Sequence, residues 1–238
     1  MTVSAFCQNP ALRVLNPVFR RDEIQRLLCT HPCWHRLNTS GNQMAIELQD
    51  FSWKRMAEAV DAVHIRTRRA ASALQEAGIP YSVAGGNAVA AWVARVDRAA
   101  VRNTQDIDIL VNRADFDTIK VALERAGFVY QDVFGVNCFL DGPAARPRDA
   151  IQLIFAGEKV RLDHPTVSAD VTDVVTADDF QVVSLDALVR MKLNSFRRKD
   201  QVHLLDLLSV GLIDSSWLAR LVPAHAARLQ ELIDDPEG

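Results

Sequence analysis

The sequence predicts a fold of the α/β (α+β) class, in which a sheet domain is followed by a helical C-terminal part. Between residues 51 and 183, short apolar stretches of strand composition alternate with stretches of helical periodicity. From residue 184 onward, apolar residues recur at helical spacing alone. The 238 residues are 49% hydrophobic and 24% charged, as in ordinary globular proteins. We therefore divide the chain into an N-terminal extension (1–50), an α/β domain (51–183) and a helical part (184–238).

The predicted elements of the α/β domain follow one another without an internal repeat. Residues 51–77 form a helix that ends at Gly78 and Pro80. The later strands and helices are recognised by apolar runs and by the glycines and prolines between them. We expect strands over 81–86, 106–111, 128–133, 135–141 and 150–157, helices over 87–96 and 114–127, and helices after 184 that break at 210–214 and near Pro223.

Two carboxylates lie close together in the predicted strand 106–111. Because strand side chains alternate between faces, Asp106 and Asp108 point the same way, roughly 7 Å apart. Such a pair repels itself and costs desolvation, so it needs neutralisation. Two interpretations are open. The pair lies at a strand edge, neutralised by water or by arginines such as Arg102, or it binds a divalent cation, since Mg²⁺ prefers carboxylate, phosphate and water oxygens.

A glycine pair precedes the acidic strand by about twenty residues, at the predicted junction of a strand and a helix. Gly85 and Gly86 would let the backbone approach a ligand closely. Asn87 is well suited as the N-cap of the following helix. The start of that helix offers free N–H groups and a positive dipole end to a phosphate. One part of this pattern can therefore hold phosphates, and the other the metal ion that bridges them.

A late helix carries the remaining candidate residues within "LVRMKLNSFRRKDQVHLLDLL" (188–208). Lys192 lies on the edge of its apolar stripe, so it is either a phosphate contact or a lysine that snorkels from the core edge. Lys199 and Asp200 support the same site or belong to a solvated face. Asp200 can also orient a basic neighbour.

The combination "GGNAVAAW…VRNTQDIDIL" resembles the nucleotidyltransferase (polymerase-β-like) superfamily. The form with Arg102, Thr104, Asp106 and Asp108 resembles the branch of AbiEii-type toxin nucleotidyltransferases and their uncharacterised bacterial relatives. The resemblance implies a nucleotidyltransferase-type mixed sheet flanked by helices. It also implies Mg²⁺ or Mn²⁺ at Asp106 and Asp108, catalytic roles for these acids with Lys192 and Asp200, and NTP binding by Gly85, Gly86, Asn87, Arg102, Thr104, Lys192 and Lys199.

The implied reaction moves a nucleoside monophosphate from an NTP to a hydroxyl of a tRNA, a protein or a small molecule. One residue departs from the superfamily pattern. Gln152 stands where a third carboxylate is expected, and an amide cannot act as a base. Asp149, Glu158 or Asp163 could replace it, although their positions along the predicted strand do not bring them to the site.

Gln152 therefore keeps a second function open, that of a nucleotide-binding pseudoenzyme acting as a regulatory or toxin–antitoxin partner. A third is a glycosyltransferase, because an Asp-x-Asp pair also chelates metal-bound sugar nucleotides. The downstream lysines fit this third function less well.

Other features are weaker. Cys29, His31, Cys33 and His35 alternate within one loop, which is not the paired spacing of a zinc site. The remaining histidines are isolated, and we expect them on the surface or hydrogen-bonded in the core: His64, His164, His203 and His225. The net charge of −3, the lack of an apolar run of ~20 residues and the lack of a secretory signal pattern predict a cytoplasmic protein without a membrane segment.

Overall fold

The structure is a computed structural model that describes residues 52–133, 135–143, 145, 149–177 and 179–237. The predicted N-terminal extension lies outside the described residues. So does the alternating cysteine and histidine loop at 29–35.

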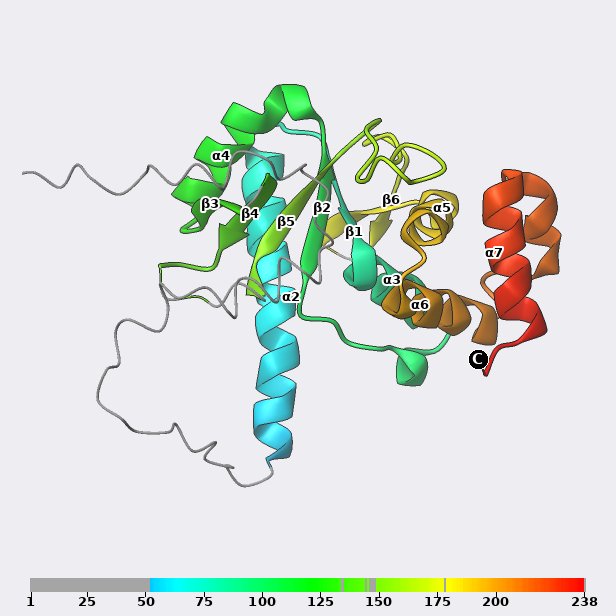
Figure 1. The fold of residues 1–238 in the computed structure, drawn as a ribbon. Helices are drawn as coiled ribbons and strands as arrows, with labels where there is room; N and C mark the ends of the chain where they lie inside the picture. The colour runs from blue at the N-terminus through cyan, green and yellow to red at the C-terminus, as the bar shows by residue number, and fades with distance from the viewer. Residues whose placement is uncertain (1–51, 134, 144, 146–148, 178, 238) are drawn as a thin grey trace, which may run out of the picture.

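A seven-stranded mixed sheet forms the centre of the fold, in the order β3-β4-β5-β2-β1-β7-β6 (Figure 1). β2 runs parallel to β5 and β1 parallel to β7, while the other neighbours are antiparallel. This arrangement confirms the predicted fold class. The strands are β1 (Tyr81–Ala84), β2 (Ile107–Val111), β3 (Val129–Val133), β4 (Val136–Leu140), β5 (Ile151–Phe155), β6 (Val174–Ala177) and β7 (Phe180–Val183).

Six α-helices and three 3-10 turns complete the described part of the chain. In Figure 1, α2 and α4 pack together on one side, while α3, α5 and α6 gather beside β1, with α7 outside them. The helices are α2 (Trp53–Glu76), α3 (Gly85–Ala94), α4 (Phe116–Arg125), α5 (Leu185–Ser195), α6 (Arg198–Ser209) and α7 (Pro223–Asp234). The 3-10 turns are η2 (Arg98–Ala100), η3 (Arg113–Asp115) and η5 (Ser215–Arg220).

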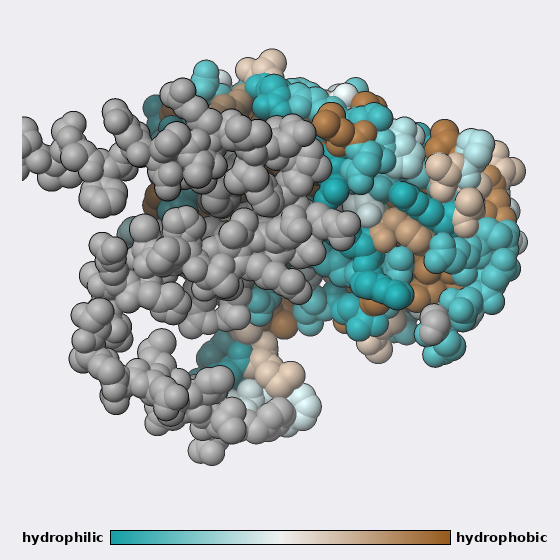
Figure 2. Space-filling view, viewed as in Figure 1, coloured by the Kyte–Doolittle hydropathy of each residue, from teal (hydrophilic) through white to brown (hydrophobic). Residues whose placement is uncertain are grey.

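The two middle strands are buried along their whole length, as expected for strands covered on both faces. One hydrophobic core joins them to the C-terminal helices, with Leu188, Leu193, Leu204 and Leu229 fully buried. The helical part therefore packs against α3 and shares one core with the sheet. On the face in Figure 2, hydrophobic residues are scattered among hydrophilic ones. Within the described ranges, we find no helix with the length and apolar character that crossing a bilayer requires.

Candidate active site

The acidic pair lies in the middle of the sheet. β2 begins at Ile107, one residue after the predicted start, so Asp106 directly precedes the strand and Asp108 is its second residue. Asp108 is 5% exposed and lies opposite Ala84 of β1 and Gln152 of β5. The strand-edge interpretation is therefore wrong. Arg102 is also not the counter-ion, because its guanidinium forms a bidentate pair with Asp206, at 3.0 and 3.1 Å.

Two lysines from the helical part supply positive charge to the acids. Lys199 of α6 donates from Nζ to Oδ2 of Asp106 at 2.7 Å. Lys192 of α5 is buried, and burial lowers its pKa, while the carboxylates of Asp200 and Asp108 act in the opposite direction. Side chains from α5 and α6 thus neutralise the paired acids of β2.

Asp200 is the most enclosed of these groups, with no exposed surface. It accepts hydrogen bonds from Lys192 Nζ (3.1 Å), Ser195 Oγ (2.8 Å) and both backbone and guanidinium of Arg197 (2.7 Å to Nε). Burial opposes its ionisation, but Lys192 and Arg197 outweigh this and lower the pKa of Asp200 far below its ordinary value. Asp200 therefore orients the side chains of Lys192 and Arg197, in agreement with the interpretation that it orients a basic neighbour.

A side chain of α7 forms hydrogen bonds with the end of α5, just before the turn into α6. Phe196 ends α5 in the left-handed region, with φ 42°, a conformation that side chains other than glycine rarely adopt. Arg228 of α7 donates from one nitrogen to the carbonyls of Leu193 (2.5 Å) and Asn194 (3.0 Å) at the end of α5. α7 thereby satisfies carbonyls that the helix end leaves without an intrahelical partner.

Close neighbours within the protein require glycine at both positions of the pair, Asp108 at Gly85 and Thr104 at Gly86. Gly85 has φ +67°, and a Cβ added there would lie 2.1 Å from Oδ2 of Asp108. A Cβ on Gly86 would lie 2.6 Å from Cγ2 of Thr104. Only glycine allows both side chains to approach the start of α3 this closely. The proposed contact of these glycines with phosphate stays a prediction.

Asn87 does not cap α3, so this prediction is wrong. The helix begins at Gly85, with Ala84 at the N-cap and no side-chain cap bond, which makes Asn87 its third residue. The amide of Asn87 instead donates to the carbonyl of Asp106 at 2.7 Å. It therefore fastens the helix to the acidic strand. The early start follows from Gly85, whose positive φ lets the chain turn directly from β1 into α3.

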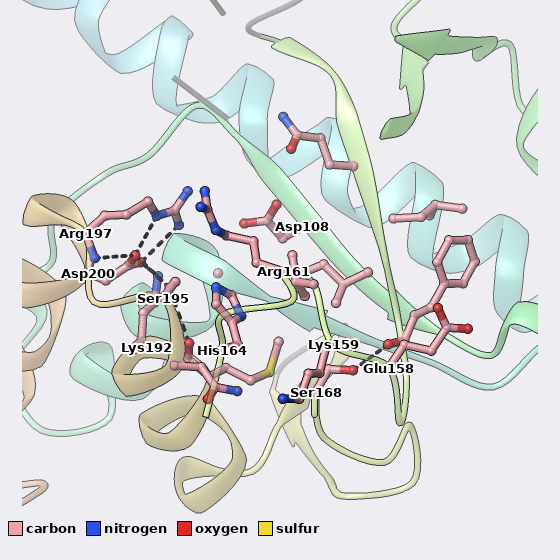
Figure 3. Close-up of a pocket in the computed structure, with 18 of the residues that line it drawn as sticks. Asp108, Glu158, Lys159, Arg161, His164, Ser168, Lys192, Ser195, Arg197 and Asp200 are labelled. Atoms are coloured by element: carbon pink, nitrogen blue, oxygen red, sulfur yellow. Dashed lines mark hydrogen bonds and ion pairs between the residues drawn. The ribbon is translucent and has the colours of Figure 1, made fainter. Parts of the chain in front are cut away.

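A cleft of about 550 Å³ opens beside Asp108 (Figure 3). Four predicted site residues line it, namely Gly85, Asp108, Lys192 and Asp200. The others do not: Gly86, Asn87, Arg102, Thr104, Asp106 and Lys199. Asp106 and Lys199 nevertheless pair with each other, immediately before the start of β2.

Gln152 also lines the cleft, in register with Asp108 on the parallel strand β5. That this amide stands where the superfamily carries a third acid stays a prediction. Glu158 and Asp163 line the cleft too, but each forms an ion pair, with Arg113 (2.5 Å) and Arg161 (3.0 Å). Across the described ranges, no three or more histidine, cysteine or acidic residues form a metal-binding group.

Sequence reasoning missed several residues of the cleft. The loop between β5 and β6 (residues 156–173, the β5–β6 loop) contributes Lys159, Arg161 and His164, and α7 contributes Arg228. The sequence shows only that this loop follows the strand that contains Gln152. It does not predict that the loop folds over the cleft. The expectation for isolated histidines holds at His225, whose Nε2 lies 2.9 Å from Asn194 Oδ1.

The expectation that isolated histidines lie on the surface or are hydrogen-bonded in the core fails at His164 and His203. Nε2 of His164 and Nδ1 of His203 have no hydrogen-bond partner among the described residues.

His203 is expected to make the free energy of unfolding depend on pH. Burial and the charge of Lys192 lower its pKa to about 4. Between pH 6.5 and pH 4 the unfolded chain binds a proton at this position that the folded chain does not bind, so the free energy of unfolding should fall as the pH falls. We expect a urea midpoint that is lower at pH 5 than at pH 7, and a smaller decrease in His203→Gln. An equal decrease in both proteins would contradict this assignment.

A mixed sheet with an Asp-x-Asp strand beside a Gly-Gly helix start defines the chain as a nucleotidyltransferase-type protein. It belongs to the family described as uncharacterised nucleotidyltransferases, whose model matches residues 13–166. The narrower resemblance to the AbiEii-type branch stays a prediction.

No curated protein matches the chain in sequence. Solved structures that match it include ANT(2'')-Ia in complex with adenylyl-2''-tobramycin, with 15% identity, a TM-score of 0.47 and coverage of 73% of this chain and 99% of that chain. JHP933 from Helicobacter pylori matches with 13% identity, a TM-score of 0.43 and coverage of 79% and 78%. TM-scores below 0.5 support no conclusion about the activity of this chain.

Proposed function

We propose that the protein transfers a nucleoside monophosphate from an NTP to a hydroxyl group and releases pyrophosphate. The observation that carries this proposal is the contact of the buried Asp108 with Gly85 at the start of α3, because it places a carboxylate beside a helix start that can receive phosphate. Membership in a nucleotidyltransferase family supports the same reaction.

The residues present fit a divalent cation. Mg²⁺ is commonly held by one or two carboxylates together with substrate phosphates and water, and Asp106 and Asp108 supply two such carboxylates. We infer that these two residues hold Mg²⁺ or Mn²⁺. When bound, the ion would neutralise the charge that develops on the triphosphate. Binding of the cation through Oδ2 of Asp106 requires that Lys199 releases this oxygen.

The basic residues have matching roles in this proposal. Lys192 contacts the triphosphate from the wall of the cleft, and Asp200 fixes its direction. Lys199, once released from Asp106, is free to donate to a phosphate oxygen. The first N–H groups of α3 receive the phosphates, since a helix start offers such donors and its N-cap residue, Ala84, has no side chain that could bond them.

A second function, a nucleotide-binding pseudoenzyme that acts as a regulatory or antitoxin-bound partner, is favoured by one observation. Gln152 is in register with Asp108, which supports the interpretation that an amide replaces a third acid here. A protein of this kind would bind NTP and metal without transfer. The acceptor of an active enzyme would be a tRNA, a protein or a small molecule.

Pyrophosphate release separates these functions. We would measure it with each of the four NTPs and Mg²⁺, with and without total tRNA, beside the double variant Asp106→Ala/Asp108→Ala. Thermal unfolding would establish that the variant is folded. Release that the variant abolishes is the expected result. NTP binding by calorimetry without release would support the pseudoenzyme, and neither binding nor release would refute both.

A further inference from the structure

His164 is the histidine that lines the cleft. It is 7% exposed and enters the cleft from the β5–β6 loop, and in Figure 3 the side chain of Arg161 lies between it and Asp108. Its Nε2 is buried and, within the part of the chain that the structure describes, accepts or donates no hydrogen bond. A buried ring nitrogen without a partner destabilises the folded protein. A ligand in the cleft that offers a hydroxyl would remove this destabilisation.

The surroundings of His164 keep its ring neutral. Burial lowers the pKa of His164, and three nearby guanidinium groups lower it further. The carboxylate of Asp163 acts in the opposite direction. A neutral imidazole carries one free lone pair, which can accept a proton. The charged and titratable groups that face the ring come from three places, namely Asp163 and Arg161 of its own loop, Arg197 at the α5–α6 turn, and Arg228 and His225 of α7.

The other acid–base groups of the cleft are already engaged. Arginine partners hold the pKa of Glu158 and of Asp163 below the ordinary range, so these carboxylates are poor bases near neutral pH. Asp200 is held ionised by Lys192 and Arg197. Asp108 has the metal role proposed above. Gln152 has no basic atom. His164 is therefore the group whose chemistry suits proton removal near pH 7.

We propose that His164 is the general base that activates the acceptor. Its imidazole takes the proton of the acceptor hydroxyl while the hydroxyl oxygen forms a bond to the α-phosphorus of the NTP. The bond from that phosphorus to the bridging oxygen of the β-phosphate breaks, and its electron pair leaves with pyrophosphate. The proton stays on the ring and passes to solvent after product release. This inference rests on the proposed transferase function, and it explains how a chain with Gln152 can catalyse transfer.

The test compares His164→Gln, which keeps a polar side chain without basicity, with His64→Gln on the exposed face of α2. Both are assayed with the NTP that the unaltered protein uses best, with total tRNA or with water alone as acceptor. We expect His164→Gln to lower kcat/KM by about 10²-fold or more, the usual contribution of a general base. We also expect it to lose the rise of kcat/KM with pH that the unaltered protein shows below pH 7. His64→Gln should match the unaltered protein.

Calorimetry separates proton transfer from binding, because NTP affinity should stay unchanged in His164→Gln. A variant that keeps both rate and pH profile would overturn the role of His164 and leave the transferase intact. A loss of rate that comes only with lost NTP affinity or lost folding, or with an unchanged pH profile, would also overturn it. If the unaltered protein releases no pyrophosphate from any NTP, the transferase itself fails, and the base with it.

Discussion

Replacing Asp200 by asparagine is expected to lower the free energy of unfolding by about 3–5 kcal/mol, as for other buried ion pairs that lose one partner. The carboxylate has no exposed surface and accepts charged hydrogen bonds from Lys192 and Arg197. Asparagine has the same shape but no charge, so Lys192 would keep its buried charge without a counter-ion. Urea unfolding at pH 7 measures the change.

Asp186→Asn is the matched control. Asp186 also pairs with an arginine, Arg190, but both side chains are partly exposed on α5. Exposed pairs contribute about 0–1 kcal/mol, so this variant should stay close to the unaltered protein. If both variants lost the same small amount, the buried network around Asp200 would not have the importance that its geometry indicates.

Gly85→Ala is expected to lower the free energy of unfolding and to abolish nucleotidyl transfer. The residue has φ +67°, which costs a side chain about 1–2 kcal/mol. The added Cβ would also lie 2.1 Å from Oδ2 of Asp108, so the carboxylate or the helix start must move. Collisions of this kind typically cost a further ~1–3 kcal/mol. Because Asp108 would leave its position beside α3, pyrophosphate release should fall to the level of the double aspartate variant.

Gly78→Ala separates the two contributions. Gly78 has a nearly equal φ of +68°, but a Cβ there would meet nothing within 4 Å. It should therefore show the backbone strain alone and keep full activity. Equal losses of stability in the two variants, or an active Gly85→Ala, would mean that the close approach of Asp108 to Gly85 is not required.

The sequence predicted those parts of the site that local pattern determines. The Gly-Gly turn and the Asp-x-Asp strand each lie within a few residues, and their residue types restrict the backbone directly. The sheet class, five of the strands and the helical end also followed from periodicity. β6 and β7 did not, because they form a hairpin of four-residue strands whose edge strand is half exposed and lacks a clear alternation.

Long-range partners could not be predicted in the same way. Nothing local pairs Lys199 with Asp106, or Arg102 with Asp206, since these contacts depend on how the C-terminal helices pack on the sheet. His164 is similar, because its burial depends on the path of a loop that has no periodicity. The error at Asn87 has a local cause, since an asparagine after two glycines fits an N-cap as well as it fits the first turn.

The hydrogen bonds from Arg228 to the end of α5 link the helix that carries Lys192 to α7, a segment more than thirty residues further along the chain. The sheet with its acids can keep its shape without that segment, because β1 and β2 lie at its centre. We expect Lys192 to lose its fixed direction, because the turn that leads to its partner Asp200 would lose these hydrogen bonds. Proteolytic clipping just before α7, or a premature stop codon there, should therefore yield a protein that still has a sheet but whose acidic strand no longer faces an ordered lysine.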